Sequence, residues 1–223
     1  MTLSYDTYQT FTVLPIDIVL TTVGTFTPVG AANGVLIINR PVVQPLGQPA
    51  SNLAEVNYGG VPGVRLARIN CQWVVNPQTS ILELWYVTGI PAGAQVITAR
   101  ETDRAYNTNM FCFSWIDAGA FQSVVTAESQ YHNTSETVSV TVTPLASSSM
   151  PFSVLSKVNS GVNTCGDIEL YQHSGGLYGM SRQDPGDDGV MDWTWATVGW
   201  YGMIGCEVVG IPAVVKKAYF AAV

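Results

Sequence analysis

Apolar and polar residues alternate along short segments of this chain, and turn-forming residues separate the segments. The most regular alternation runs over residues 137–143, where valine occupies every second position. Because successive side chains of a strand point to opposite faces, this pattern predicts a strand with one buried and one exposed face. The residues expected inside are Val138, Val140 and Val142, and those expected outside are Thr137, Ser139, Thr141 and Thr143.

A longer run of strand-forming segments covers residues 56–99, with turns at Gly59-Gly60, Asn76-Pro77 and Pro91-Ala92-Gly93. Residues 81–87, at its centre, have the sequence ILELWYV. This spacing predicts a half-buried strand rather than a helical turn. One face would carry Leu82, Leu84 and Tyr86, and the other would carry Glu83 among Ile81, Trp85 and Val87.

Similar patterns predict strands over residues 34–43, 110–116, 151–158, 167–172 and 203–209. The chain is rich in Val, Thr, Gly, Ser and aromatic residues, which favour strands and turns. We therefore predict an all-β fold, an antiparallel β-sandwich that is jelly-roll-like. It would form a single main domain over residues 31–215, followed by a C-terminal tail over residues 216–223. We find no convincing internal sequence repeat.

Residues 1–30 are polar and Thr-rich, with one short apolar segment. Pro15 limits this segment to an edge strand or an extended arm, because proline donates no backbone hydrogen bond. We expect an N-terminal arm that pairs with a sheet edge of a neighbouring subunit or of the shell beneath it. The alternative is an ordinary first strand of the same sandwich. The expected oligomer or shell contacts are Val13, Leu14, Ile16, Ile18 and Leu20.

Charge and hydropathy exclude several partners. The formal net charge is −7 and only nine residues are Lys or Arg, so the basic surface that binds nucleic acid is missing. The best apolar stretch, residues 208–215, is far shorter than the about 18 residues of a membrane span. No basic segment followed by an apolar core begins the chain, so we expect no cleaved signal peptide and assembly in the cytoplasm.

Four cysteines, at positions 71, 112, 165 and 206, are expected to be reduced and mostly buried. Two histidines and no C-x-x-C pair give no basis for a zinc site. A G-x-S-x-G elbow, a phosphate-binding glycine loop and an H-E-x-x-H motif are all missing. We therefore expect a protein that is not an enzyme.

An acidic loop over residues 184–192 places four carboxylates close together in sequence, with two glycines between them. Calcium prefers such oxygen ligands, although Asp and Gly are also the common residues of solvated turns. Both interpretations stay open, and no other cofactor is expected. The candidate metal ligands are Asp184, Asp187, Asp188 and Asp192.

Aromatic residues follow the acidic loop at positions 193, 195, 200 and 201. Aromatic rings beside carboxylates can bind sugars, but alternating aromatic residues in a sandwich also form a core or a subunit interface. The candidate ligand or interface residues are therefore Trp193, Trp195, Trp200 and Tyr201.

Three short motifs occur in a familiar order: Tyr58-Gly59-Gly60, Trp85-Tyr86 and Pro91-Ala92-Gly93. Together with the apolar residues 34–38, they resemble a β-sandwich family found in tailed-phage virion proteins of the decoration and fibre type and in bacterial surface proteins. The resemblance implies a fold and a habitat, and no reaction.

The function that this resemblance implies is structural. We expect an outer capsid decoration or cement protein on the surface of a phage particle. Its expected partners are the major capsid protein or another virion protein and further copies of itself, with a trimer favoured. The alternative is a carbohydrate- or receptor-binding module of a phage fibre or spike.

Overall fold

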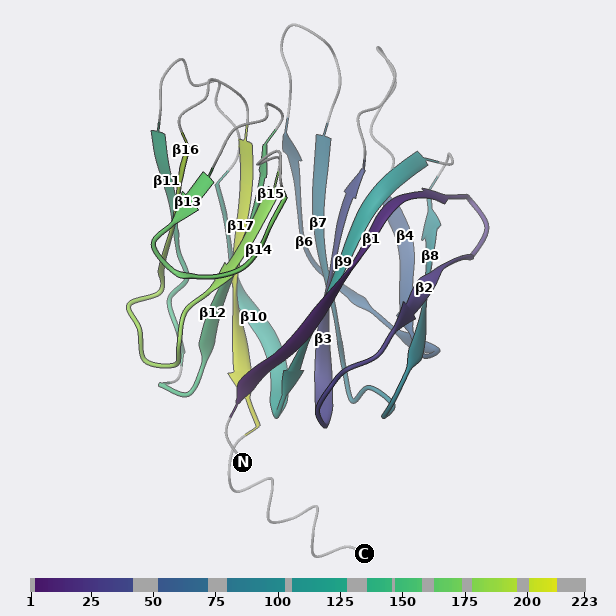
Figure 1. Ribbon diagram of the computed structural model, residues 1–223, viewed down its shortest axis with the longest axis horizontal. Coiled ribbons are helices and arrows are strands. Elements are labelled where there is room, and N and C mark those ends of the chain that lie inside the picture. The colour runs from purple at the N-terminus through teal and green to yellow at the C-terminus, as the bar shows by residue number, and fades with distance from the viewer. Residues whose placement is uncertain are drawn as a thin grey trace, which may run out of the picture.

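The computed structural model describes residues 3–41, 52–71, 80–102, 106–127, 136–145, 147–157, 163–173, 178–195 and 201–211. These residues form strands and contain no helix, and each pair of neighbouring strands runs antiparallel (Figure 1). The predicted all-β, antiparallel class is confirmed. No helix of this part of the chain could cross a membrane.

The first half of the chain folds into two sheets. The first inner sheet has the order β1 (Ser4–Ile16), β9 (Tyr106–Ile116), β3 (Ala32–Pro41), β7 (Ser80–Thr88), β6 (Val64–Cys71). The first outer sheet has the order β2 (Thr21–Phe26), β8 (Gln95–Glu101), β4 (Leu53–Tyr58), β5 (Val61–Pro62).

The second half also folds into two sheets. The second inner sheet has the order β10 (Ala118–Ala127), β17 (Tyr201–Gly210), β12 (Met150–Lys157), β15 (Tyr178–Arg182), β14 (Ile168–Gln172). The second outer sheet has the order β11 (Glu136–Thr141), β16 (Val190–Trp195), β13 (Asn163–Cys165).

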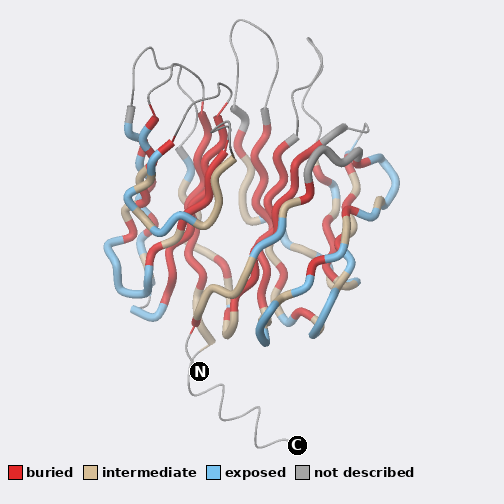
Figure 2. The backbone as a smooth tube through the Cα atoms, in the orientation of Figure 1, coloured by how far each residue is buried: buried red, intermediate tan, exposed pale blue. Residues whose placement is uncertain are grey.

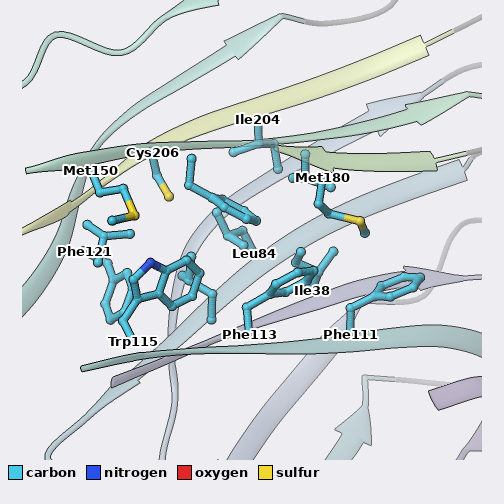
Figure 3. Packing of buried hydrophobic residues seen from close by; sticks show 14 of the residues in the cluster. Ile38, Leu84, Phe111, Phe113, Trp115, Phe121, Met150, Met180, Ile204 and Cys206 are labelled. Atoms are coloured by element: carbon cyan, nitrogen blue, oxygen red, sulfur yellow. The ribbon is translucent and has the colours of Figure 1, made fainter. Parts of the chain in front are cut away.

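The four sheets stack as layers, with the two inner sheets in the middle (Figure 1). Separate hydrophobic cores fill the three gaps between them. The central core joins the inner sheets and is rich in aromatic rings; Trp115 packs edge-on against Phe121 and Phe152 at 5.9 and 5.6 Å between ring centroids (Figure 3). The central strands of both inner sheets are therefore buried on both faces, as Figure 2 shows, while edge strands, among them β1, β10 and β14, stay partly exposed.

The two halves of the chain have the same strand topology. Replacing β1, β9, β3, β7 and β6 by β10, β17, β12, β15 and β14 reproduces the order of the inner sheet. Replacing β2, β8 and β4 by β11, β16 and β13 reproduces the outer sheet, and β5 is an addition to the first half. Each half is thus a complete sandwich, so the described chain holds two sandwiches where the sequence predicted one.

Some irregularities of the inner sheets repeat as well, whereas the shifts in the β3–β9, β2–β8 and β4–β8 pairings occur in the first half alone. The β1–β9 pairing shifts register twice, and so does the β10–β17 pairing. The β6–β7 pairing shifts once, as does the β14–β15 pairing. Because bulges re-aim a strand at a defined place, their recurrence supports a true structural repeat.

The sandwiches face each other in a two-fold manner. Tyr8 on β1 packs against Tyr171 on β14, with 5.6 Å between ring centroids, while β10 packs against β6. In the repeat, β10 is the counterpart of β1 and β6 is the counterpart of β14. The β10–β6 contact is therefore the counterpart of the β1–β14 contact, as a two-fold relation between the sandwiches requires. At the C-terminal ends of β3 and β12, Arg40 donates to Ser156 Oγ at 2.9 Å and to the Lys157 carbonyl at 3.0 Å.

A single residue connects the sandwiches. Asp117 lies between β9 and β10 with a positive φ of 60°, which turns the chain from one inner sheet into the other. Its carbonyl accepts the Ile211 N–H at 2.8 Å, and the Asn33 side chain accepts the Ala118 N–H at 2.8 Å. The junction is therefore fixed by residues of both sandwiches.

Two sequence predictions about strands need correction. The segment 81–87 was expected to be half-buried, but β7 is covered by a core on each face. The N-terminal segment was expected to form an arm, but β1 pairs with β9 and β2 pairs with β8 within the first sandwich. The alternative of an ordinary edge strand is the one that the structure shows, and residue 31 is not a domain boundary.

Other predictions hold. Val138, Val140 and Val142 are buried, and the polar residues between them are exposed. Cys112, Cys165 and Cys206 are free thiols, while the side chain of Cys71 lies outside the described residues. The predicted tail over residues 216–223 also lies outside them.

Candidate functional site

Three of the four candidate acidic residues, Asp184, Asp187 and Asp188, lie in the turn between β15 and β16, where they bind the turn itself. Asp188 Oδ1 accepts the Val190 N–H at 2.9 Å and the Gln183 amide at 3.1 Å, and these hydrogen bonds lower the pKa of Asp188. Asp187 Oδ2 accepts the Asp184 N–H at 3.0 Å, and Asp184 forms an ion pair with Arg182.

A carboxylate from elsewhere in the sequence completes this corner. Asp167, between β13 and β14, accepts the Gln183 amide at 2.9 Å and the Asp192 N–H at 3.2 Å. Burial raises the pKa of Asp167. Asp167, Gln183 and Asp188 line an open hollow of about 520 Å³. Sequence analysis missed Asp167 because strand pairing, and not sequence proximity, brings it to the loop.

The four predicted metal ligands are not gathered around one point. Among the described residues, no group of three or more His, Cys, Asp or Glu side chains is close enough to hold a metal ion. Asp184, Asp187 and Asp188 are exposed turn residues, and Asp192 lies on β16. The solvated-turn interpretation describes these residues better than the calcium site does.

The aromatic residues form a core. Trp193, Trp195 and Tyr201 are buried between the second inner and second outer sheets. Trp193 Nε1 donates to Ser153 Oγ at 3.1 Å, and the Trp195 and Tyr201 rings lie 5.1 Å apart. Because these rings face inward, they offer no open surface for a sugar. Trp200 lies outside the described residues.

A buried lysine accompanies this core. Lys157 Nζ lies 5.3 Å from the Trp195 ring centroid, in the range of a cation–π contact. Burial lowers the pKa of Lys157 to about 8.

The predicted N-terminal contact residues separate into two groups. Ile16 is fully buried in the first sandwich, whereas Ile18 and Leu20 are exposed in the connection between β1 and β2. Val13 and Leu14 belong to β1, and their side chains lie outside the described part of the chain.

A second hollow, of about 730 Å³, lies on the outer surface of the first outer sheet. Glu55 of β4 lies in its lining, accepts the Asn57 amide at 2.8 Å and pairs with Arg100 of β8 at 3.3 Å. The Asn57 hydrogen bond, with Arg100, lowers the pKa of Glu55. The apolar side chains of the lining are Leu20, Pro62, Ala94 and Val96, and Asn57, Gln95 and Thr98 add polar groups.

Sequence analysis did not identify this hollow, although it identified the turns beside it. Gly59 and Gly60 have positive φ of 57° and 81°, and Gly93 has 76°, so the two glycine turns are formed as predicted. The first turn follows β4 and the second precedes β8. These two strands pair with each other, and residues of both line the hollow.

The carboxylate of Glu83 is buried inside the first sandwich. Glu83 Oε2 accepts the Asn39 amide at 2.9 Å and the Leu53 N–H at 3.0 Å, and Oε1 lies 3.4 Å from Arg65. Removal from water raises the pKa of Glu83 despite these donors. These hydrogen bonds join Asn39 of β3 and Leu53 of β4 to β7, so we assign Glu83 to the support of the strands around it.

Comparisons with known proteins give no family. No protein-family model, curated protein sequence or solved structure matches this chain.

Proposed function

We propose that this chain is a structural protein of a tailed-phage particle, an outer decoration protein that stabilises the head through protein contacts. The observation that carries the proposal is the fusion of two jelly-roll-like sandwiches through one aromatic core. Jelly rolls recur in viral capsids, where stiff sheets present loops and faces to neighbouring subunits. This step is an analogy at the level of the fold.

Rigidity supports a cementing role. The central strands of each inner sheet are buried on both faces, and Arg40 hydrogen-bonds across the gap between the sheets. A body of this kind transmits force between bound partners, because packed cores resist compression. The acidic balance of −7 suits a surface that faces solvent and away from the genome.

The alternative, a sugar-binding module, loses the surface on which it was based. Its aromatic residues Trp193, Trp195 and Tyr201 are buried in the second sandwich. We therefore favour a role in protein contacts for the exposed faces of the molecule.

The test is binding to particles. Purified protein would be mixed with phage particles assembled without it, and bound protein would be measured by co-sedimentation. We expect saturable binding and greater resistance of the particles to heat. Complete particles, which already carry the protein, are the matched control and should bind no more. Equal binding to both kinds of particle, or binding to neither, would refute the proposal.

A further inference from the structure

Three consecutive aliphatic residues are exposed to water in the connection between β1 and β2. Ile18, Val19 and Leu20 have 52, 62 and 51% of their surface exposed. This connection is among the exposed segments in Figure 2. Contiguous exposed apolar residues of this kind mark interaction sites in soluble proteins. We refer to Ile18, Val19 and Leu20 as the aliphatic tip.

Local hydrogen bonds hold the aliphatic tip in shape. The Ile18 N–H donates to Asp17 Oδ1 at 2.6 Å, and Thr21 Oγ1 donates to the Val19 carbonyl at 3.0 Å. Because Asp17 is bound to the backbone, its carboxylate is directed toward the turn. The tip is therefore a shaped protrusion whose side chains project outward.

The hollow on the first outer sheet lies directly beside this tip. Leu20 belongs to both, since it forms one wall of the hollow of about 730 Å³. Val96, which is 44% exposed, adds a second aliphatic wall. The same face of the molecule thus carries an apolar protrusion and a depression with aliphatic walls and a polar side formed by Glu55, Asn57 and Thr98.

Electrostatics at this face permit two acidic molecules to meet. The chain carries a net charge of −7, which opposes self-association in general. At the hollow, however, the carboxylate of Glu55 is neutralised by Arg100 at 3.3 Å. A chain with nine Lys and Arg residues and a net charge of −7 repels an anionic lipid surface, so such a surface is a poorer partner for the tip.

We propose that two copies of the chain associate through this face, related by a two-fold axis, so that the aliphatic tip of each copy enters the hollow of the other. A patch that carries both the protrusion and the depression is self-complementary, and a two-fold axis closes such a contact. This dimer does not depend on the proposed role in a phage particle.

The dimer is expected to be weak. A standard stable interface uses about 20–30 residues on each side, and the tip and hollow together offer fewer. Sedimentation equilibrium of the full chain, over micromolar to near-millimolar concentrations, should therefore show monomers and dimers in exchange.

Two variants test the two halves of the contact. Val19→Lys places a charge on the tip, and Val96→Lys places one in the hollow. Each should raise the dissociation constant by about tenfold or more, because burial of one valine is worth about 1.5 kcal/mol. Val29→Lys is the matched control, since Val29 is 84% exposed outside both the tip and the hollow. All three should keep the thermal midpoint of the parent chain.

Three results would overturn the proposal: a monomer at every concentration, a trimer, or a dimer that neither Val19→Lys nor Val96→Lys weakens. Particle binding by the same variants separates this inference from the proposed function. A monomer whose particle binding is lost in Val19→Lys shows that the tip contacts the particle, which refutes the dimer and keeps the virion role. A dimer that binds no particles keeps the dimer and refutes the virion role.

Discussion

Replacing Ile16 by alanine should destabilise the protein strongly, whereas the same change at Ile18 should not. Ile16 is fully buried in the core of the first sandwich, and Ile18, two residues further on, is 52% exposed. Removing three carbon groups from a buried site costs about 2.4 kcal/mol at about 0.8 kcal/mol each. The cavity left behind adds to this, so a total of about 3 kcal/mol is expected.

Thermal and urea unfolding, followed by circular dichroism in dilute protein, measure the difference. For a chain of 223 residues, each kcal/mol corresponds to about 2–4 °C in the melting temperature, so Ile16→Ala should melt about 6–12 °C lower. Ile18→Ala should stay within about 0.5 kcal/mol of the parent, as exposed substitutions usually do. Equal effects at the two positions, or none at either, would refute the placement of this segment within the first sandwich.

Three further predictions concern the interior. Val140→Asp should prevent folding, because a buried, unpaired carboxylate costs several kcal/mol, while Thr141→Asp on the exposed face should melt like the parent in the same assay. Gly179→Ala should destabilise by about 1–3 kcal/mol in urea, since the added Cβ would lie 2.4 Å from the Trp193 ring; a stability equal to the parent would refute this tight contact. Glu83→Gln should change the pH dependence of stability. The raised pKa of Glu83 means that the folded state holds this proton more tightly, so its contribution is full below about 4.5 and is lost as pH rises through the raised pKa. Glutamine does not titrate, so the parent loses stability between pH 4.5 and the raised pKa of Glu83 while Glu83→Gln does not. The stability of the variant relative to the parent should therefore increase over this pH interval. A difference that stays constant with pH would contradict the raised pKa of Glu83.

Strand positions could be predicted because alternation and turn residues are local signals. The valines of β11 show this well, since their neighbours are polar and exposed. The layers could not be predicted, because a strand covered on both faces lacks alternation. Each described residue of β12 is buried, and β7 interrupts its apolar run only at Glu83.

The structural repeat could not be predicted for a different reason. Equivalent strands fill the central core with different side chains: β9 contributes Phe111, Phe113 and Trp115, whereas β17 contributes Ile204, Cys206 and Val208. Backbone pairing and bulges preserve the topology while the packing residues differ. Similarly, the N-terminal segment was mistaken for an arm because Pro15 is compatible with an edge strand and with an arm, and only the pairing of β1 with β9 decides between them.

The fusion of two like sandwiches frees each half to diverge. In a dimer of identical subunits, a single substitution alters both copies of a surface at once, so the two outer faces must remain identical. In this chain the same substitution alters one face and leaves the other unchanged. The additional strand β5 and the hollow occur on the first outer sheet, while the tryptophan pair lies under the second. The chain thus keeps the mechanical benefit of a symmetric pair while its two outer faces can evolve toward different partners.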